Sequence, residues 1–341
     1  MASSSKDTKT CAAVKPVPMS SAPPPPCDLP LGLMSPASWV PYMQLMRLDR
    51  PAGFIGFYMP SVLGLVYAAS LGREKVEPMQ LLWGSGFFLV ANIFIRGAAC
   101  TWNDNIDQEY DRQVLRCRQR PIARRAVSTT QAHVFLAVQL VVLAMLFNPL
   151  PRPCAAVATV MGALYALYPF CKRFTHYPQA ILGVPLALSI VISAYSLDID
   201  VAFFNARNGP ATLALCAAEV FWTMIYDTIY AHQDLPDDVR AGVKSMAVRF
   251  RHCTKPLCSL LAVLQLALLT LAGVWTDMPA GYFLVGVSGT AVALAVMIAS
   301  VELDVPASCA RWFKLGFCFV GGSMNGGFLV AYLESWWFNQ S

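Results

Sequence analysis

Two acidic clusters follow long apolar segments of this chain, and their side chains could bind a divalent cation. The first cluster reads N-D-N-I-D-Q-E-Y-D from Asn103 to Asp111, and the second reads D-T-I-Y-A-H-Q-D-L-P-D-D from Asp227 to Asp238. A carboxylate in hydrocarbon is costly, about 2.5–3.5 kcal/mol at a helix centre on insertion scales. Proteins commonly hold Mg²⁺ through one or two carboxylates plus substrate phosphates. The clusters therefore predict a magnesium and phosphate site at a membrane edge.

The carboxylates in each cluster have helical spacing. Asp104, Asp107 and Asp111 follow an i, i+3, i+7 pattern, and Asp227 and Asp234 are seven residues apart. Each set shares one helix face if the preceding helix continues, and a bound cation would remove the repulsion between like charges. A solvated charged loop is the alternative for either cluster alone, but two such clusters together favour metal binding. The predicted metal ligands are Asn103, Asp104, Asp107, Asp111, Asp234, Asp237 and Asp238.

Basic residues accompany both clusters. Lys244 follows the second cluster and could reach phosphate oxygens. Arg96 precedes Asn103 by seven residues, about two helical turns, so it faces the same way as the first cluster. An arginine inside an apolar segment needs an anionic partner. That partner could be Asp104, Asp107, a diphosphate or the carboxylate of a substrate.

The segments that must position these residues are apolar enough to cross a membrane. Of the 341 residues, 56% are hydrophobic and 13% are charged, whereas a soluble domain averages about 25% charged residues. A spanning helix needs about 20 mostly apolar residues. We therefore predict an all-α, multi-pass membrane protein, with about nine transmembrane helices in one bundle around a central cavity. The predicted spans are 52–71, 80–102, 130–149, 154–170, 178–197, 211–226, 257–276, 280–301 and 315–338.

The distribution of Lys and Arg predicts the orientation of these spans. With the N-terminus in the cytosol, the cytosolic segments hold most basic residues, in 47–50, 112–125, 172–173, 240–255 and 311–314. The opposite loops hold only Arg73, Lys75, Arg152 and Arg207. This asymmetry follows the positive-inside rule, and it places both acidic clusters in the cytosol and the C-terminus across the membrane. Basic residues spread over several loops do not favour nucleic-acid binding.

Residues 1–41 differ in composition from the rest of the chain. They are rich in Ser, Pro, Ala and Lys, which is typical of a disordered segment. We predict a disordered cytosolic tail at 1–41 and one transmembrane domain at 42–341. The tail has no apolar segment typical of a secretory signal peptide. It also has no Arg before Arg47, which argues against a mitochondrial transit peptide.

The acidic clusters also match known sequence motifs. N-D-x-x-D-x-x-x-D at Asn103–Asp111 and D-x-x-Y-A-x-x-D-x-x-D-D at Asp227–Asp238 resemble the two signatures of the UbiA superfamily of intramembrane prenyltransferases. Between them, Y-P-F-C-K-R-F-T-H-Y-P-Q at Tyr168–Gln179 resembles a segment of the 4-hydroxybenzoate polyprenyltransferase branch. The similarity begins near Tyr42 and identifies 42–341 as a UbiA-type prenyltransferase domain.

Three segments are most similar to fungal meroterpenoid enzymes, which attach farnesyl to a polyketide-derived phenolic acid. They are 47–58, 100–107 and 118–124. This resemblance implies the endoplasmic reticulum or another endomembrane rather than the mitochondrial inner membrane. The sequence departs from the family at Arg120–Arg125, which reads R-P-I-A-R-R where typical members read R-P-L-P-S-G. How this loop closes over a diphosphate therefore stays open.

The resemblance implies a mechanism. Two Mg²⁺ ions bridge the acidic clusters and an isoprenyl diphosphate, and basic side chains stabilise the leaving diphosphate. The allylic C–O bond ionises in a pocket that excludes water, and the phenol ring attacks the cation. The implied catalytic residues are Asp227, which would activate the phenol, Asp107 and Asp111. The implied substrate-binding residues are Arg47, Arg96, Arg116, Arg120, Lys172, Arg173, Tyr230 and Lys244.

Arg47 or Arg96 would bind the carboxylate of the acceptor. The aromatic residues that could line the pocket are Phe54, Phe57, Tyr58 and Trp102. The expected partners are the two substrates and the lipid bilayer, with no stable protein partner.

Three alternatives stay open on the sequence. The first is a mitochondrial 4-hydroxybenzoate polyprenyltransferase of ubiquinone biosynthesis, and the second is a terpene cyclase on the same scaffold. The third is an ion or solute transporter, which would place its acidic residues near mid-span and show weakly similar halves. Here the acidic residues lie at helix ends on one side and basic residues follow them, which favours the transferase.

Overall fold

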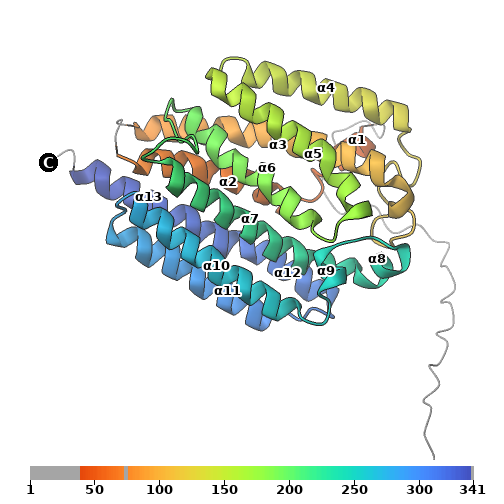
Figure 1. Ribbon diagram of the computed structural model, residues 1–341. Coiled ribbons are helices and arrows are strands. Elements are labelled where there is room, and N and C mark those ends of the chain that lie inside the picture. The colour runs from red at the N-terminus through yellow and green to blue at the C-terminus, as the bar shows by residue number, and fades with distance from the viewer. Residues whose placement is uncertain (1–38, 73–75, 339–341) are drawn as a thin grey trace, which may run out of the picture. The chain divides into compact units, whose positions relative to one another are not determined.

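A computed structural model describes residues 39–72 and 76–338 of the protein. Residues 1–38 of the predicted tail, with Arg73 and Lys75, lie outside the described residues. Every regular element within these ranges is a helix (Figure 1). The first half contains α1 (Val40–Leu45), α2 (Ala52–Ser70), α3 (Pro78–Asp111), α4 (Thr129–Phe147), α5 (Arg152–Phe174) and α6 (Pro178–Tyr195). The second half contains α7 (Gly209–Ala231), the 3-10 turn η2 (His232–Asp234), α8 (Leu235–Ala241), α9 (Met246–Arg249), α10 (Thr254–Trp275), the π-helical η3 (Tyr282–Ser288), α11 (Gly289–Ser300), α12 (Pro306–Gly316), the π-helical η4 (Phe317–Gly321) and α13 (Gly322–Phe338).

Nine helical segments in the described part of the chain are long and apolar enough to cross a membrane. They correspond one to one to the predicted spans, and α4 and α5 confirm the division of the region 130–170 into two helices. The chain is therefore an integral, multi-pass membrane protein. The helix α3 continues well beyond the predicted end at 102, so the first acidic cluster forms its last turns.

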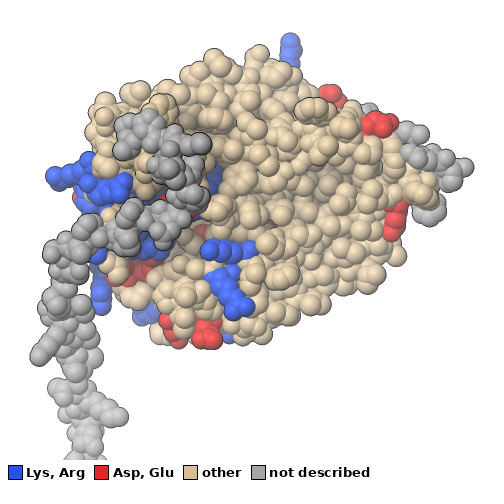
Figure 2. All heavy atoms as spheres, turned by 180° about the vertical axis from the view of Figure 1, so that it is seen from behind, with Lys and Arg blue, Asp and Glu red and all other residues tan. Residues whose placement is uncertain are grey.

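Successive spans run in opposite directions, so the connections gather at two ends of the bundle (Figure 1). One end, at the right of Figure 1, carries α8, α9 and the loop 112–128, whereas the C-terminus lies at the other. Figure 2 shows many Lys and Arg side chains at the first end, here called the charged end, and a broad uncharged surface beside it. Between the two ends, α6 packs against α2, α5 and α7, and α7 packs against α10.

Local sequence signals explain where several helices begin. Ser128 Oγ accepts a hydrogen bond from the Gln131 backbone N–H, and Gln131 Oε1 accepts one from the Ser128 N–H, which forms a capping box for α4. Pro178 and Pro236 lie in the first turns of α6 and α8, where a missing N–H leaves no helical bond unmade. The helix α7 ends at Ala231, so the second cluster spans the last turn of α7, then η2 and α8.

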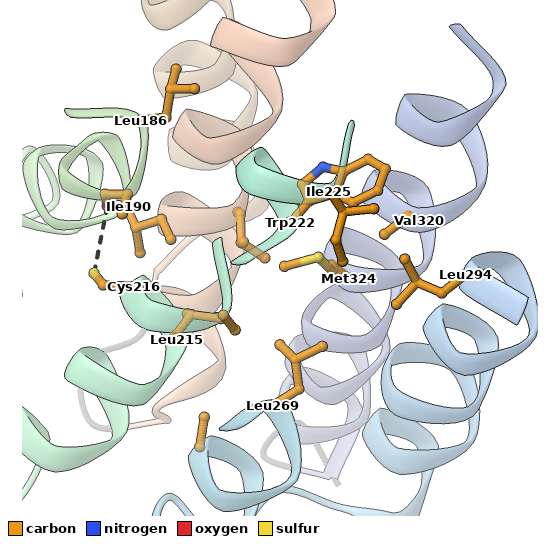
Figure 3. Close-up of a cluster of buried hydrophobic side chains, with 14 of the residues drawn as sticks. Leu186, Ile190, Leu215, Cys216, Trp222, Ile225, Leu269, Leu294, Val320 and Met324 are labelled. Carbon is orange, nitrogen blue, oxygen red and sulfur yellow. Dashed lines mark hydrogen bonds between the residues drawn. The ribbon is translucent and has the colours of Figure 1, made fainter. Parts of the chain in front are cut away.

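Buried apolar side chains from α6, α7, α10, α11 and α13 form the main core (Figure 3). Polar contacts also join the helices around this core. Tyr67 Oη on α2 lies 3.0 Å from Thr212 Oγ1 on α7. Cys216 Sγ donates to the Ala187 carbonyl of α6 at 3.5 Å, the dashed line in Figure 3. The core fixes α6 and α7, which carry part of the site.

Gly64 allows α2 to approach α6 closely, and replacing it will destabilise the bundle. A Cβ at position 64 would lie 2.3 Å from the Ile190 carbonyl oxygen, so Gly64→Ala forces two backbones apart. Overpacking of this kind costs about 1–3 kcal/mol. Thermal unfolding in detergent should show a lower Tm for Gly64→Ala. Gly162→Ala on α5 is the control, because no heavy atom lies within 4 Å of its Cβ position. Equal Tm values for the two variants would contradict close packing at Gly64.

Candidate active site

A cavity of about 880 Å³ lies among the helices at the charged end. Residues of α2, α3, α5, α6, α7 and α12 line it, together with parts of the loops 112–128 and 242–245. This confirms the predicted central cavity. The predicted site residues that line it are Arg47, Arg96, Asn103, Asp104, Asp107, Asp111, Arg116, Arg120, Lys172, Asp227, Tyr230, Asp234, Asp238 and Lys244.

The last turns of α3 bury their carboxylates against basic side chains. Asp104 Oδ1 accepts hydrogen bonds from Arg47 Nη2 at 2.6 Å and from Arg120 Nη1 at 3.1 Å. Arg120 Nη1 also donates to Asp111 Oδ2 at 2.9 Å. Burial alone would lower the pKa of Arg120, but Asp104 and Asp111 outweigh it and raise this pKa well above its usual value. Arg120 therefore stays charged and joins two carboxylates of the first cluster.

Three of the predicted metal ligands in the first cluster each have a buried oxygen atom that makes no hydrogen bond within the described structure. These atoms are Asn103 Oδ1, Asp104 Oδ2 and Asp107 Oδ1. The other oxygen of Asp107, Oδ2, accepts from Lys172 Nζ at 2.7 Å, as Asp104 Oδ1 accepts from its arginines. A buried polar atom without a partner is costly, and oxygen atoms are the ligands that Mg²⁺ prefers. The residues present therefore fit a magnesium ion.

The acidic side chains do not converge on one point in this structure. Across residues 39–72 and 76–338, no three or more His, Cys, Asp or Glu side chains lie close enough together to hold a metal ion. Ion pairs explain this arrangement, because Arg47, Arg120 and Lys172 each draw a carboxylate of α3 toward themselves.

The second cluster is held by the loop that follows α3. Arg116 Nε donates to Asp234 Oδ1 at 2.9 Å, and Arg116 Nη1 donates to Tyr230 Oη at 3.0 Å. The Leu115 backbone N–H donates to Asp237 Oδ2 at 3.0 Å. Because Arg120 of the same loop binds the first cluster, the loop 112–128 ties both clusters to one cavity.

Aromatic side chains line the apolar part of the cavity. Phe57 of α2 and Tyr165 of α5 stack with ring centroids 5.7 Å apart. Tyr226 of α7 packs edge-on against Phe317 of η4, with a centroid distance of 4.8 Å. All four residues belong to the cavity wall. The cavity therefore combines a charged part with an apolar, aromatic part. A substrate with a diphosphate head and an isoprenoid tail requires both.

Comparison with known proteins decides the family. Residues 53–321 match the model of the UbiA prenyltransferase family. The chain belongs to the UbiA prenyltransferase family. It is 37% identical over 305 residues to the prenyltransferase ascA of Acremonium egyptiacum, with 88% of each chain covered. These similarities make it a membrane-embedded aromatic prenyltransferase.

Other relatives with this UbiA domain have more specific names. The chain is 36% identical over 254 residues to the DMOA farnesyltransferase nvfB of Aspergillus novofumigatus, covering 74% of this chain and 79% of the relative. It is 36% identical over 299 residues to the mitochondrial 4-hydroxybenzoate polyprenyltransferase of Schizosaccharomyces pombe, covering 86% and 78%. A solved UbiA homologue from Archaeoglobus fulgidus bound to GPP and Mg²⁺ shares the fold, with a TM-score of 0.58, 16% identity, and coverage of 86% and 99%.

Two of the predicted site residues of this UbiA chain point elsewhere. Arg173 is exposed outside the cavity, and its Nη2 donates to the Ile106 carbonyl at 3.0 Å. Asp237 bonds the loop backbone at Leu115 and is not part of the cavity wall. Among the four predicted pocket aromatics, only Phe57 lines the cavity.

The other three aromatics have partners outside the cavity. Phe54 stacks on Tyr58 with ring centroids 5.8 Å apart, and the Tyr58 hydroxyl lies 2.5 Å from Ser85 Oγ. Trp102 Nε1 donates to the Ala166 carbonyl at 2.9 Å.

Arg96 hydrogen-bonds to backbone carbonyls and not to a carboxylate of the first cluster. Its guanidinium donates to the backbone carbonyls of Arg47 at 2.9 Å and Arg50 at 2.8 Å. Two carbonyl oxygens thus satisfy a buried arginine without a carboxylate. Neither Asp104 nor Asp107 receives a hydrogen bond from it.

The UbiA cavity also contains residues that sequence reasoning did not select for it. Asp49, Arg50 and Lys314 contribute charge to its wall, and Tyr165 and Tyr168 contribute phenol groups. Asp49, Arg50 and Tyr168 lie in the segments 47–58 and 168–179, whose resemblance to family motifs could have indicated them. Lys314 gave no local signal besides its charge, because only the packing of α12 brings it to the cavity.

Proposed function

We propose that this UbiA-type enzyme transfers farnesyl from farnesyl diphosphate to a ring carbon of a polyketide-derived phenolic acid, in a Mg²⁺-dependent step of meroterpenoid biosynthesis. One observation carries the proposal: residues of both acidic clusters and eight basic residues line a single cavity whose wall also contains aromatic side chains. The farnesyl group is supported by the sequence segments 47–58, 100–107 and 118–124 and by the similarity to a fungal farnesyltransferase.

The charged part of the cavity would bind the diphosphate. Arg116, Arg120 and Lys172 are held there by carboxylates, and their N–H groups can shift to phosphate oxygens when the substrate enters. Fixed positive charge where negative charge develops stabilises the leaving diphosphate. Asn103, Asp104 and Asp107 would hold Mg²⁺ by their free oxygens. When bound, Mg²⁺ supplies Lewis acidity at the diphosphate.

The aromatic part of the cavity would hold the isoprenoid chain and the acceptor ring. Its wall of Phe57, Tyr165, Tyr226 and Phe317 excludes water from the allylic cation and offers ring faces to the positive charge. Breaking the C–O bond releases diphosphate and leaves an allylic cation. A C–C bond to a ring carbon then forms, and loss of the proton from that carbon restores the aromatic ring. Asp227 lines the cavity one helical turn before Tyr230 and is the candidate base that activates the phenol.

The substrates can be identified with membranes that contain the enzyme. We expect farnesyl diphosphate to give higher kcat/KM than geranyl or geranylgeranyl diphosphate. A phenolic acid should react faster than its methyl ester or its decarboxylated analogue, because a charged carboxylate can pair with a cavity arginine. Mass spectrometry should locate the new bond on a ring carbon. Preference for another chain length would refute the farnesyl assignment, and equal rates with acid and ester would refute carboxylate recognition.

A mitochondrial 4-hydroxybenzoate polyprenyltransferase is the second candidate. The similarity to the mitochondrial enzyme of Schizosaccharomyces pombe over 86% of this chain favours it. Organelle fractionation separates the candidates, because the first predicts the enzyme in the endoplasmic reticulum or another endomembrane. A preference for 4-hydroxybenzoate with longer polyprenyl diphosphates would select the second.

We infer that the charged end and the N-terminus face the cytosol, because Lys and Arg gather at that end (Figure 2). On sealed microsomes, a protease should remove an N-terminal tag and leave a C-terminal tag intact until detergent is added. Digestion of the C-terminal tag without detergent would contradict the orientation or the odd number of spans.

A further inference from the structure

We propose that Arg96 is a positioning residue. It holds the turn 47–50 by its backbone, which keeps Arg47 on Asp104 and so orients one carboxylate of the diphosphate site. This inference rests on the proposed function in one respect, since it takes the first acidic cluster as the place where Mg²⁺ and diphosphate bind.

The contacts of Arg96 define a clamp on one short turn. Nη1 donates to the Arg47 carbonyl at 2.9 Å, and Nη2 donates to the Arg50 carbonyl at 2.8 Å. Arg96 is only 6% exposed, so both bonds are shielded from water. The planar fork of a guanidinium can reach two acceptors in fixed directions, whereas a lysine ammonium cannot reproduce that geometry. Arg96 thus fixes the course of the backbone just before α2.

The clamped turn contains a backbone conformation that needs support. Arg47 has φ +57°, in the left-handed region that residues with a Cβ rarely adopt. Such a conformation persists where surrounding contacts over-determine it. Here Arg96 holds the Arg47 carbonyl from one side, and the Arg47 backbone N–H donates to the Gln44 carbonyl at 3.0 Å from the other. This conformation directs the Arg47 side chain toward α3.

The result of the clamp is visible at Asp104. Arg47 Nη2 donates to Asp104 Oδ1 at 2.6 Å, next to Arg120 Nη1 at 3.1 Å. Two donors on Oδ1 leave Oδ2 buried and free of protein partners. Without Arg47, only Arg120 would hold this carboxylate, and Arg120 is shared with Asp111. Arg96 therefore acts on Asp104 through Arg47.

Gly53 provides the space that the clamp needs. A Cβ at position 53 would lie 2.9 Å from Arg96 Nη2. Gly53→Ala would push the guanidinium away from its carbonyls while leaving Arg96, Arg47 and Asp104 chemically unchanged. Gly53→Ala is therefore a second way to break the hydrogen bonds of Arg96. It keeps the test informative if an arginine variant fails to fold.

The test is a double-mutant cycle read by binding. The probe is a non-ionising thiol analogue of farnesyl diphosphate, titrated by calorimetry into purified enzyme in lipid nanodiscs at several Mg²⁺ concentrations. Arg96→Gln and Arg47→Ala should each weaken Mg²⁺-dependent binding by about 10- to 100-fold, as expected for hydrogen bonds to charged groups. The double variant should be no weaker than Arg47→Ala, because both changes break one chain of contacts. Gly53→Ala should weaken binding in the same direction, and Gly162→Ala should not.

Additive losses in the double variant would overturn the proposal, because Arg96 would then act independently of Arg47. Unchanged binding in Gly53→Ala would also overturn it. A kinetic result would do the same: if Arg96→Gln raised only the KM of the acceptor and abolished the preference for acid over methyl ester, Arg96 would be an acceptor-binding residue. Failure of the proposed function looks different, since the unmodified enzyme would then bind the analogue without any Mg²⁺ dependence.

Discussion

Asp107→Ala and Asp234→Ala will each reduce prenyl transfer by at least about 100- to 1,000-fold, the loss typical for removal of a group that stabilises developing charge. Asp107 presents one free buried oxygen and anchors Lys172 by the other at 2.7 Å. Asp234 anchors Arg116 with its two oxygens. Each substitution therefore removes a proposed ligand for the cation and releases a basic residue that we propose binds diphosphate. Initial rates in membranes, normalised to the amount of inserted protein, measure the effect.

A matched acidic residue on α3 serves as the control for this prediction. Glu109 lies two residues after Asp107, but its side chain is 76% exposed and pairs with Arg112 outside the cavity wall. Glu109→Gln should keep near-normal turnover. Asp107→Asn should stay nearly inactive, because an amide keeps the shape of the carboxylate and loses its charge. Near-normal turnover in Asp107→Ala or Asp234→Ala would show that one cluster alone suffices.

Removal of divalent cations will abolish the activity almost completely. With EDTA in excess, we expect a rate below about 1% of the starting rate, and added Mg²⁺ should restore it, because several kcal/mol of charge stabilisation at the diphosphate disappear with the ion. The free oxygens of Asn103, Asp104 and Asp107 are the structural basis for this expectation. EDTA saturated with Mg²⁺ beforehand is the control for effects of the chelator itself.

Substitution by Ca²⁺ makes the metal prediction more specific. Ca²⁺ prefers longer bonds and more ligands than Mg²⁺, so it should restore only a small part of the activity. Full activity after exhaustive chelation would contradict a metal-dependent site built on the first cluster.

The sequence predicted the elements of the fold well because membrane spans are marked by length and polarity alone. All nine predicted spans correspond to helical segments in the described residues. The carboxylates of α3 were also predictable, since i, i+3 and i+7 spacing places them on one face when the helix continues. Their ion-pair partners were not predictable, because Lys172 pairs with Asp107 across 65 positions of the chain. Such pairs depend on how α3 and α5 pack.

Arg173 and Arg96 show two further limits of sequence reasoning. Lys172 and Arg173 are neighbours on α5, and consecutive helical residues point about 100° apart, so only Lys172 enters the cavity. Their motif does not reveal which one does. Arg96 lies in an apolar segment, where an anionic partner was the natural expectation. In the structure, the Arg96 guanidinium donates its hydrogen bonds to backbone carbonyls. Every residue carries such a carbonyl, so no sequence pattern marks these partners.

An experimental structure with Mg²⁺ and the thiol analogue of farnesyl diphosphate will show whether both acidic clusters form one diphosphate site. We expect the diphosphate to lie between the end of α3 and the η2–α8 turn. Asp107 and Asp234 should both lie next to bound metal, with the isoprenoid chain against Phe57 and Tyr226. A diphosphate bound outside this cavity, or one held by the first cluster with no metal near Asp234, would contradict a single site formed by both clusters.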